Sequence, residues 1–181
     1  MKKYSFLFLI SVVLLSCTAV RQEKGVAKVD IESKLKELNI QLTTPSPPTA
    51  SFVKTVRVGN LIYTSGHGPD KPGGGQVTGK LGSDLTLAQG QEAARLTGIS
   101  LLSSLKAEIG DLNKVKRIVK VLGMVNCDPK FTQQPQVMNA FSDMMVQIFG
   151  EKGKHARSAV GMNALPGNIA IEIEMIVEVT K

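Results

Sequence analysis

Two long segments of the chain carry apolar residues at every third or fourth position, which is the spacing of an amphipathic helix. The first begins with a capping-box sequence at Thr86 to Gln89, and its apolar positions are Ala94, Leu101, Leu102, Leu105 and Ile109. The second has Pro135 in its first turn, and its apolar positions are Val137, Phe141, Met144, Met145, Ile148 and Phe149. Gly110 and Gly150 suit the C-terminal ends. The pattern predicts two long helices, each burying one face.

Five other segments have the aliphatic content or the alternation of β-strands. Residues 53–58 and 61–65 flank Gly59-Asn60, a residue pair that favours a tight hairpin turn. The remaining predicted strands are residues 116–125, 156–162 and 169–179.

A shorter helical pattern precedes these elements, with Asp30 suited to its N-cap and with apolar residues at Ile31, Leu35, Leu38 and Ile40. The order after it is strand, strand, helix, strand, helix, strand, strand. Two helices that each bury one stripe pack well on one face of a mixed sheet. We therefore predict an α+β fold with both long helices on one face and a short N-terminal helix. The other sheet face would be apolar, which favours oligomerisation.

The start of the chain has the shape of an export signal. Lys2 and Lys3 precede an apolar run that ends at Leu15, and Ser16-Cys17 follows it. This junction resembles the lipobox of bacterial lipoproteins, which implies cleavage before Cys17 and lipid attachment to its sulfur. An ordinary secretory signal is the alternative, and the run is short for spanning ~30 Å of hydrocarbon.

These features divide the chain into a signal peptide at residues 1–16, a lipidated tether at 17–29 and one domain at 30–181. We expect the protein in the bacterial cell envelope, either anchored to a membrane by lipid or periplasmic after signal cleavage.

Charge and composition narrow the class of partner. The chain has 22 basic and 15 acidic residues, and removal of the signal would leave a net charge of about +5. Such a surplus favours anionic small molecules or an anionic membrane surface. Trp is absent and aromatic residues make up 4% of the chain, so there is no platform for stacking bases. We expect no nucleic acid partner.

Several residues of catalytic type lack the context that their chemistry needs. The glycine-rich stretch up to Lys80 nearly spells a phosphate-binding loop, but Leu81 stands where Ser or Thr is required. His67 and His155 have no metal-ligand spacing, so we expect no metal site. Cys127 ends an aliphatic strand and is interpreted as a small buried hydrophobe.

Arg157 and Glu172 are the strongest candidates for a functional site. In an alternating strand Arg157 shares a face with His155 and with the small residues Ala159 and Gly161, and the small residues leave room for its guanidinium to bind a carboxylate. A surface arginine in a weak ion pair is the alternative. Glu172 shares a face with Glu174; ordinary solvent exposure is one interpretation. If another subunit covers that face, burial would raise the pKa of one carboxyl toward the range of a general acid or base.

Four segments together resemble the Rid family, also called YjgF or endoribonuclease L-PSP proteins. They are residues 59–66 (Gly-Asn-Leu-Ile-Tyr-Thr-Ser-Gly), 111–125, 137–139 (Val-Met-Asn) and 157–174. The resemblance covers about residues 31–181. The leader helix and residues 155–161 (His-Ala-Arg-Ser-Ala-Val-Gly) are most similar to a less characterised subgroup with a longer N-terminus.

The resemblance implies a chorismate-mutase-like fold that assembles as a homotrimer with three pockets between subunits. Deaminases of this family hydrolyse 2-iminoacids and their enamine tautomers to 2-ketoacids and ammonia without a cofactor. Mapped onto this chain, Arg157 binds the substrate carboxylate, Glu172 is the acid/base, and Ser65 and Asn139 line the pocket. Phe52 stands where the family has a pocket tyrosine.

Two functions follow from these observations. The first is cofactor-free hydrolysis of reactive imines, for which Arg157 and Glu172 are both present. The second is a non-catalytic trimeric envelope module that binds small carboxylates, which the missing hydroxyl at Phe52 and the export signal favour.

Overall fold

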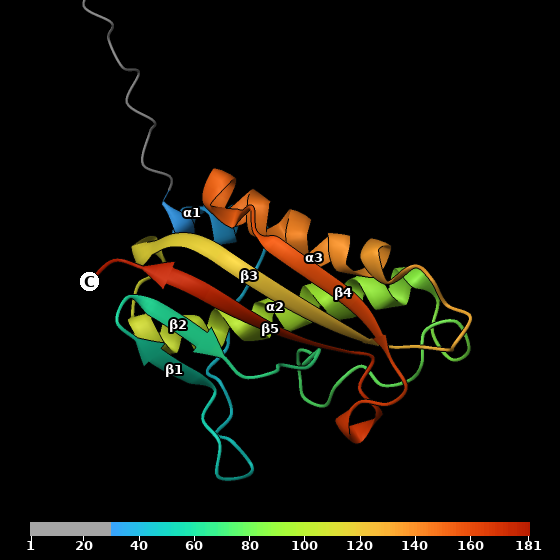
Figure 1. The fold of residues 1–181 in the computed structure, drawn as a ribbon. Coiled ribbons are helices and arrows are strands. Elements are labelled where there is room, and N and C mark those ends of the chain that lie inside the picture. The colour runs from blue at the N-terminus through green and yellow to red at the C-terminus, as the bar shows by residue number, and fades with distance from the viewer. Residues whose placement is uncertain (1–29) are drawn as a thin grey trace, which may run out of the picture.

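A computed structural model describes residues 30–181 as a five-stranded mixed sheet with helices packed on one face (Figure 1). The strands are β1 (Thr55–Val58), β2 (Leu61–Thr64), β3 (Val115–Asn126), β4 (Ala156–Met162) and β5 (Ile171–Val179). Their order across the sheet is β1-β2-β5-β3-β4, and every neighbouring pair is antiparallel except β3 with β4. This confirms the predicted α+β class.

The two long helices, α2 (Leu87–Ile109) and α3 (Gln134–Phe149), lie side by side behind the sheet, and the short α1 (Ile31–Glu37) lies near the end of α3 (Figure 1). The alternation of β5 explains this layering. Its aliphatic positions are buried toward the helices, whereas Glu172, Glu174 and Ile176 are only half-buried on the other face. That other face is called the open face below.

The ends of the helices follow the capping signals in the sequence. Thr86 accepts a hydrogen bond from the backbone N–H of Gln89, whose side chain bonds back to the N–H of Thr86. Gly110 ends α2 with a φ of 77°, which glycine adopts without strain. Asp30 caps α1 through the N–H of Ser33. Asp30, Thr86 and Gly110 thus act as predicted.

Three features lie beyond the local pattern. The pairing of β3 with β5 shifts register twice, and Val119 lies in the second shift. A 3₁₀ turn, η2 (Gly150–Gly153), joins α3 to β4. Gly153 in this turn packs directly against the backbone of Met145. The glycine-rich loop is tied to the core by Leu81, which is fully buried.

The sequence predicted an apolar open face, but the structure shows a mixed one, on which Glu172, Glu174 and Lys120 accompany apolar side chains. Val56 and Val58 of β1 and Tyr63 of β2 project from it and are 50%, 60% and 41% exposed. Val160 of β4 adds a further exposed apolar side chain at the opposite edge. The homotrimer itself stays a prediction. The predicted signal peptide and tether, residues 1–29, lie outside the described residues.

Candidate functional site

Arg157 reaches the helices from the edge of the sheet. In the parallel pairing of β4 with β3 it lies opposite Val121, which in turn lies opposite Met175 of β5. Val121 and Met175 are both buried against the helices, so Arg157 projects from the helix side. Because β4 is an edge strand, its side chain can extend along α3 while remaining half-exposed.

The guanidinium of Arg157 is held by neutral oxygen acceptors on α3. Its Nη1 donates to Asn139 Oδ1 at 3.1 Å and to Ser142 Oγ at 3.0 Å, and Nη2 donates to the carbonyl of Pro135 at 3.5 Å. None of the ion pairs among residues 30–181 includes Arg157. The weak surface ion pair considered as an alternative is therefore not formed within the described chain, and the positive charge is free to meet an anion.

Glu172 forms a second cluster on the open face, where β5 pairs it with Met124 of β3. Its carboxyl group lies directly over Gly66, so closely that a Cβ atom at that position would overlap Oε1. Burial raises the pKa of the Glu172 carboxyl above its ordinary value, and the neighbouring charge of Glu174 raises it further. A half-buried carboxyl with a raised pKa has the character of a general acid or base.

Ser65 lies next to this second cluster, at the end of β2. Its hydroxyl donates to the carbonyl of Lys54 at 3.4 Å, and its backbone N–H donates to the same carbonyl at 3.0 Å. Phe52, two positions before Lys54, is 48% exposed. The chain therefore groups Ser65 with Glu172 and groups Asn139 with Arg157.

The two groups project from opposite faces of one sheet. Arg157 lies on the side of Met175, and Glu172 is three positions away from Met175 along β5, so it points to the other side. The sequence-based expectation that Arg157 and Glu172 meet in one cleft can therefore hold only between two copies of the chain. Alternation within a strand predicts which residues of that strand share a face. It does not predict whether the face of β4 that carries Arg157 and the face of β5 that carries Glu172 lie on the same side of the sheet.

Ser142 was not foreseen as a neighbour of Arg157, whereas the alternation of the strand predicted that His155 lies on the same face. Both residues join Arg157, with Val146 and Lys154, around a cavity of about 410 Å³ at the end of α3. Ser142 is three residues after Asn139 and so lies on the same helix face, a spacing from which the sequence could have indicated it.

His67 has a structural role. It is 4% exposed, its Nδ1 lies 2.9 Å from the carbonyl of Ser65 and its Nε2 lies 2.8 Å from Ser104 Oγ. Burial lowers the pKa of His67, so the ring is neutral and fixes the backbone that leads into Gly66.

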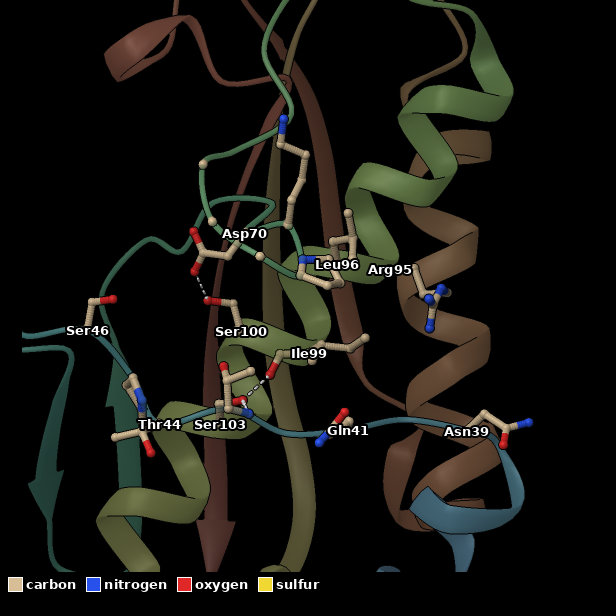
Figure 2. A pocket seen from close by; sticks show the side chains of 17 residues that line it. Asn39, Gln41, Thr44, Ser46, Asp70, Arg95, Leu96, Ile99, Ser100 and Ser103 are labelled. Carbon is tan, nitrogen blue, oxygen red and sulfur yellow. Dashed lines mark hydrogen bonds between the residues drawn. The ribbon is translucent and has the colours of Figure 1, made fainter.

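A further cavity, of about 500 Å³, lies elsewhere (Figure 2). It is bounded by the segment 39–46, the loop 70–75 and the outer face of α2. Asp70 accepts a hydrogen bond from Ser100 in its wall, and Ser103 accepts one from the N–H of Thr43. None of the site residues inferred from the sequence lines it.

Residues 30–181 contain no group of three His, Cys, Asp or Glu side chains placed to bind a metal ion. Cys127 is buried, in contact with the side chain of Gln134. Within the same residues, no helix combines the length and apolar character needed to cross a bilayer.

The fold and the residues around Arg157 together define a class: a mixed-sheet α+β protein with an arginine at the sheet edge that has no acidic partner within residues 30–181. Residues 32–179 match the family described as "YjgF/chorismate_mutase-like, putative endoribonuclease", and the chain belongs to this family. The resemblance inferred from the sequence is thereby confirmed at the level of the family and its fold.

Relatives extend over most of the chain. Protein TCP17 of Trypanosoma cruzi is 40% identical over 154 residues, which are 84% of this chain and 96% of that protein. The crystal structure of Atu1372 from Agrobacterium tumefaciens, described as of unknown function, is 41% identical with a TM-score of 0.78 over 83% of this chain and 92% of the other. A "putative endoribonuclease" from Shewanella oneidensis is 27% identical with a TM-score of 0.80, over 83% and 100%.

Proposed function

We propose that this protein hydrolyses reactive enamine or imine intermediates, the 2-iminoacids, to 2-ketoacids and ammonia without a cofactor. The observation that carries the proposal is the guanidinium of Arg157, which is held by neutral acceptors on α3 and has no carboxylate partner among residues 30–181. A 2-iminoacid supplies the missing carboxylate. Bidentate binding would fix the imine carbon relative to the protein, and such orientation lowers the barrier to water attack.

Glu172 is the proposed acid/base. In hydrolysis the oxygen of water bonds to the imine carbon, protons pass from water to the imine nitrogen, and the carbon–nitrogen bond breaks to release ammonia and leave a carbonyl. A carboxyl group whose pKa is raised by burial and by Glu174 stays protonated to a higher pH than an ordinary carboxyl, so it is better suited both to donate and to accept these protons.

The proposed site is composite, with Arg157 and Asn139 from one copy and Glu172 and Ser65 from the next. The exposed apolar side chains of Val56, Val58 and Tyr63 on the open face support such packing, because exposed apolar patches of this kind favour association. A homotrimer closes three such sites by symmetry.

A coupled assay tests the catalytic proposal. An amino-acid oxidase generates 2-iminopropanoate, and its decay is followed with and without the mature protein. We expect accelerated decay that is lost in Arg157→Ala and reduced at least about tenfold in Glu172→Gln. Gln147→Glu, on the exposed side of α3, serves as a control that keeps the rate. Decay at the buffer rate with the wild-type protein would contradict a catalytic role.

A second candidate function is capture of small carboxylates without turnover. Phe52 favours it, since this residue is 48% exposed and brings no hydroxyl group to the site. Binding of 2-ketobutyrate in calorimetry, lost in Arg157→Ala and combined with no acceleration of imine decay, would identify the protein as a binding module.

We also propose a lipid anchor at Cys17 and a place in the cell envelope. The sequence Ser16-Cys17 after an apolar run supports both. Cys17→Ser should move the protein from the membrane fraction to the soluble fraction of the source cells, and unchanged fractionation would contradict lipidation.

A further inference from the structure

The guanidinium of Arg157 is hydrogen-bonded to Ser142, which is itself hydrogen-bonded to His155. Arg157 Nη1 donates to Ser142 Oγ at 3.0 Å, and the same oxygen lies 3.1 Å from Nε2 of His155. The other ring nitrogen of His155, Nδ1, lies 2.7 Å from the carbonyl oxygen of Gly153. Three side chains and one carbonyl therefore form a continuous chain of hydrogen bonds that ends at Arg157.

The direction of each bond in this chain is fixed by chemistry. A carbonyl oxygen only accepts, so Nδ1 of His155 carries the proton. In the neutral ring Nε2 is then an acceptor, and the Ser142 hydroxyl donates its proton to it. The lone pairs of Ser142 Oγ are left to accept from Arg157. The neutral form of His155 thus orients the Ser142 oxygen as an acceptor for the guanidinium.

Protonation of His155 would reverse this arrangement. Nε2 would become a donor, so an imidazolium and a guanidinium would share one hydroxyl oxygen as their acceptor. Two positive charges would then lie within about 6 Å of each other, where like charges repel strongly if partly buried. The guanidinium, which is half-exposed at the sheet edge, can relieve this repulsion by leaving Ser142.

We propose that Ser142 and His155 are positioning residues, which hold Arg157 in the orientation that binds a carboxylate and release it when His155 is protonated. The inference rests on the proposed function in one respect, that Arg157 is the residue that receives the substrate carboxylate. It adds a condition that the family resemblance does not contain: carboxylate binding weakens in acid through His155.

The surroundings of His155 favour the neutral ring. Burial lowers the pKa of His155 below its ordinary value of 6.5, and the charge of Arg157 lowers it further, whereas the hydrogen bond that His155 donates to the carbonyl of Gly153 raises it. The ring packs edge-on against Phe141, with centroids 5.9 Å apart and planes at 72°. The ring is therefore neutral at pH 7 and takes up its proton at lower pH.

The charged groups on the neighbouring elements do not offset this effect. Lys154 lines the same cavity and is paired with Glu151 of η2. The ammonium group of Lys152 donates to the carbonyl of Val115. Asp143 of α3 faces a different cavity, shared with Arg95. Among the described residues, no hydrogen bond or ion pair joins a carboxylate to His155 or to Arg157.

Calorimetry with 2-ketobutyrate at pH 7.5 and pH 5.5 tests the inference on the full-length mature protein. His155→Gln is the informative variant, because its amide oxygen can accept from Ser142 but does not titrate. Ser142→Ala removes the acceptor, and Arg157→Ala is the negative control. We expect the wild-type affinity to fall measurably between the two pH values, by at most about tenfold, because a pKa of His155 below 6.5 leaves part of the rings neutral at pH 5.5.

In His155→Gln this fall should disappear, with the affinity at pH 7.5 within about threefold of wild type. Ser142→Ala should bind weakly at both pH values. Any pH effect of Glu172 is common to the wild type and His155→Gln, so it cancels in the comparison. An equal fall in both proteins would overturn the inference while leaving the proposed function intact.

Nitrogen NMR of the His155 ring gives a readout that needs no ligand. We expect the neutral ring to carry its proton on Nδ1 and to titrate at higher pH in Arg157→Ala than in the wild type. A proton on Nε2, or a titration unaffected by Arg157→Ala, would overturn the inference. Failure of 2-ketobutyrate to bind the wild type at pH 7.5 would instead count against the proposed function.

Discussion

At the scale of single residues, the proposed site depends on small residues as much as on the charged ones. Gly66 lets the carboxyl of Glu172 lie directly on the backbone, and Ala159 leaves β4 uncrowded beside Arg157. The burial that raises the pKa of Glu172 is a consequence of this close approach. A carboxyl group placed in this way costs stability, which makes its presence informative about function.

Gly66→Ala tests the link between this close approach and activity. The added methyl group would displace the Glu172 carboxyl, a flexible group that can swing into solvent, so the fold should lose less than about 1 kcal/mol. Imine hydrolysis should fall at least about tenfold, because the acid/base moves away from its place. Gly73→Ala, in the glycine-rich loop, has open space but a φ of 87°, so it should cost about 1 kcal/mol of stability and still keep the activity. Equal activity in Gly66→Ala and the wild type would contradict the assignment.

Glu172→Gln should separate stability from activity. The folded chain raises the pKa of Glu172 above 4.5, so the folded state binds this proton more tightly than the unfolded state does. The contribution of Glu172 to stability therefore declines as the pH rises from about 4.5 through the raised value. At pH 8 the variant should melt about 1–2 °C above the wild type, a small gain because water screens a half-exposed group. At pH 4 the two melting temperatures should coincide; a lower Tm for the variant at pH 8 would contradict this account.

At the scale of elements, the turn η2 determines how the end of α3 meets β4. Gly153 approaches the backbone of Met145 so closely that no side chain fits between them. The same glycine presents its carbonyl to His155, which precedes β4 by one residue. One tight contact thus sets both the packing of α3 and the hydrogen bonds behind Arg157.

Gly153→Ala should destabilise the fold by about 2–3 kcal/mol, because the methyl group would meet rigid backbone rather than a mobile side chain. Urea unfolding measures the loss. Glu151→Ala, an exposed change in the same turn, is the matched control and should stay within about 0.5 kcal/mol of the wild type. Similar stabilities for the two variants would show that the turn can relax.

The elements could be predicted from the sequence because their signals are local. Helical spacing, the capping box at Thr86 and the pair Gly59-Asn60 placed helices and strands close to the observed bounds. The side of the sheet on which Arg157 and Glu172 each lie could not be predicted in this way. They depend on the order β5-β3-β4 and on the shifts in β3, which are set by tertiary packing.

At the scale of the whole molecule, helices cover one face of the sheet and leave the open face uncovered within the described chain. The helices cover one side of the sheet, while Val56, Val58 and Tyr63 leave the other side with exposed apolar surface. An uncovered sheet face of this composition is expected to find a partner in water. The proposed composite site gives the same expectation from chemistry.

Val56→Glu should therefore dissociate the assembly. A carboxylate in the centre of an apolar contact must be buried or must hold the subunits apart, and either penalty weakens association. Sedimentation equilibrium should give the mass of a trimer for the wild type and that of a monomer for Val56→Glu. Gln147→Glu places the same charge on α3 and should leave the mass unchanged; a monomeric wild type would contradict the proposed assembly.

The opposite directions of Arg157 and Glu172 have a genetic consequence. If each catalytic centre draws its arginine from one subunit and its glutamate from the neighbour, two inactive proteins can repair one another. Refolding Arg157→Ala together with Glu172→Gln in equal amounts would create mixed rings in which about one centre in four has both wild-type residues. Activity restored by mixing, from two stocks that have almost none apart, would be the signature of subunits that share their chemistry across a boundary.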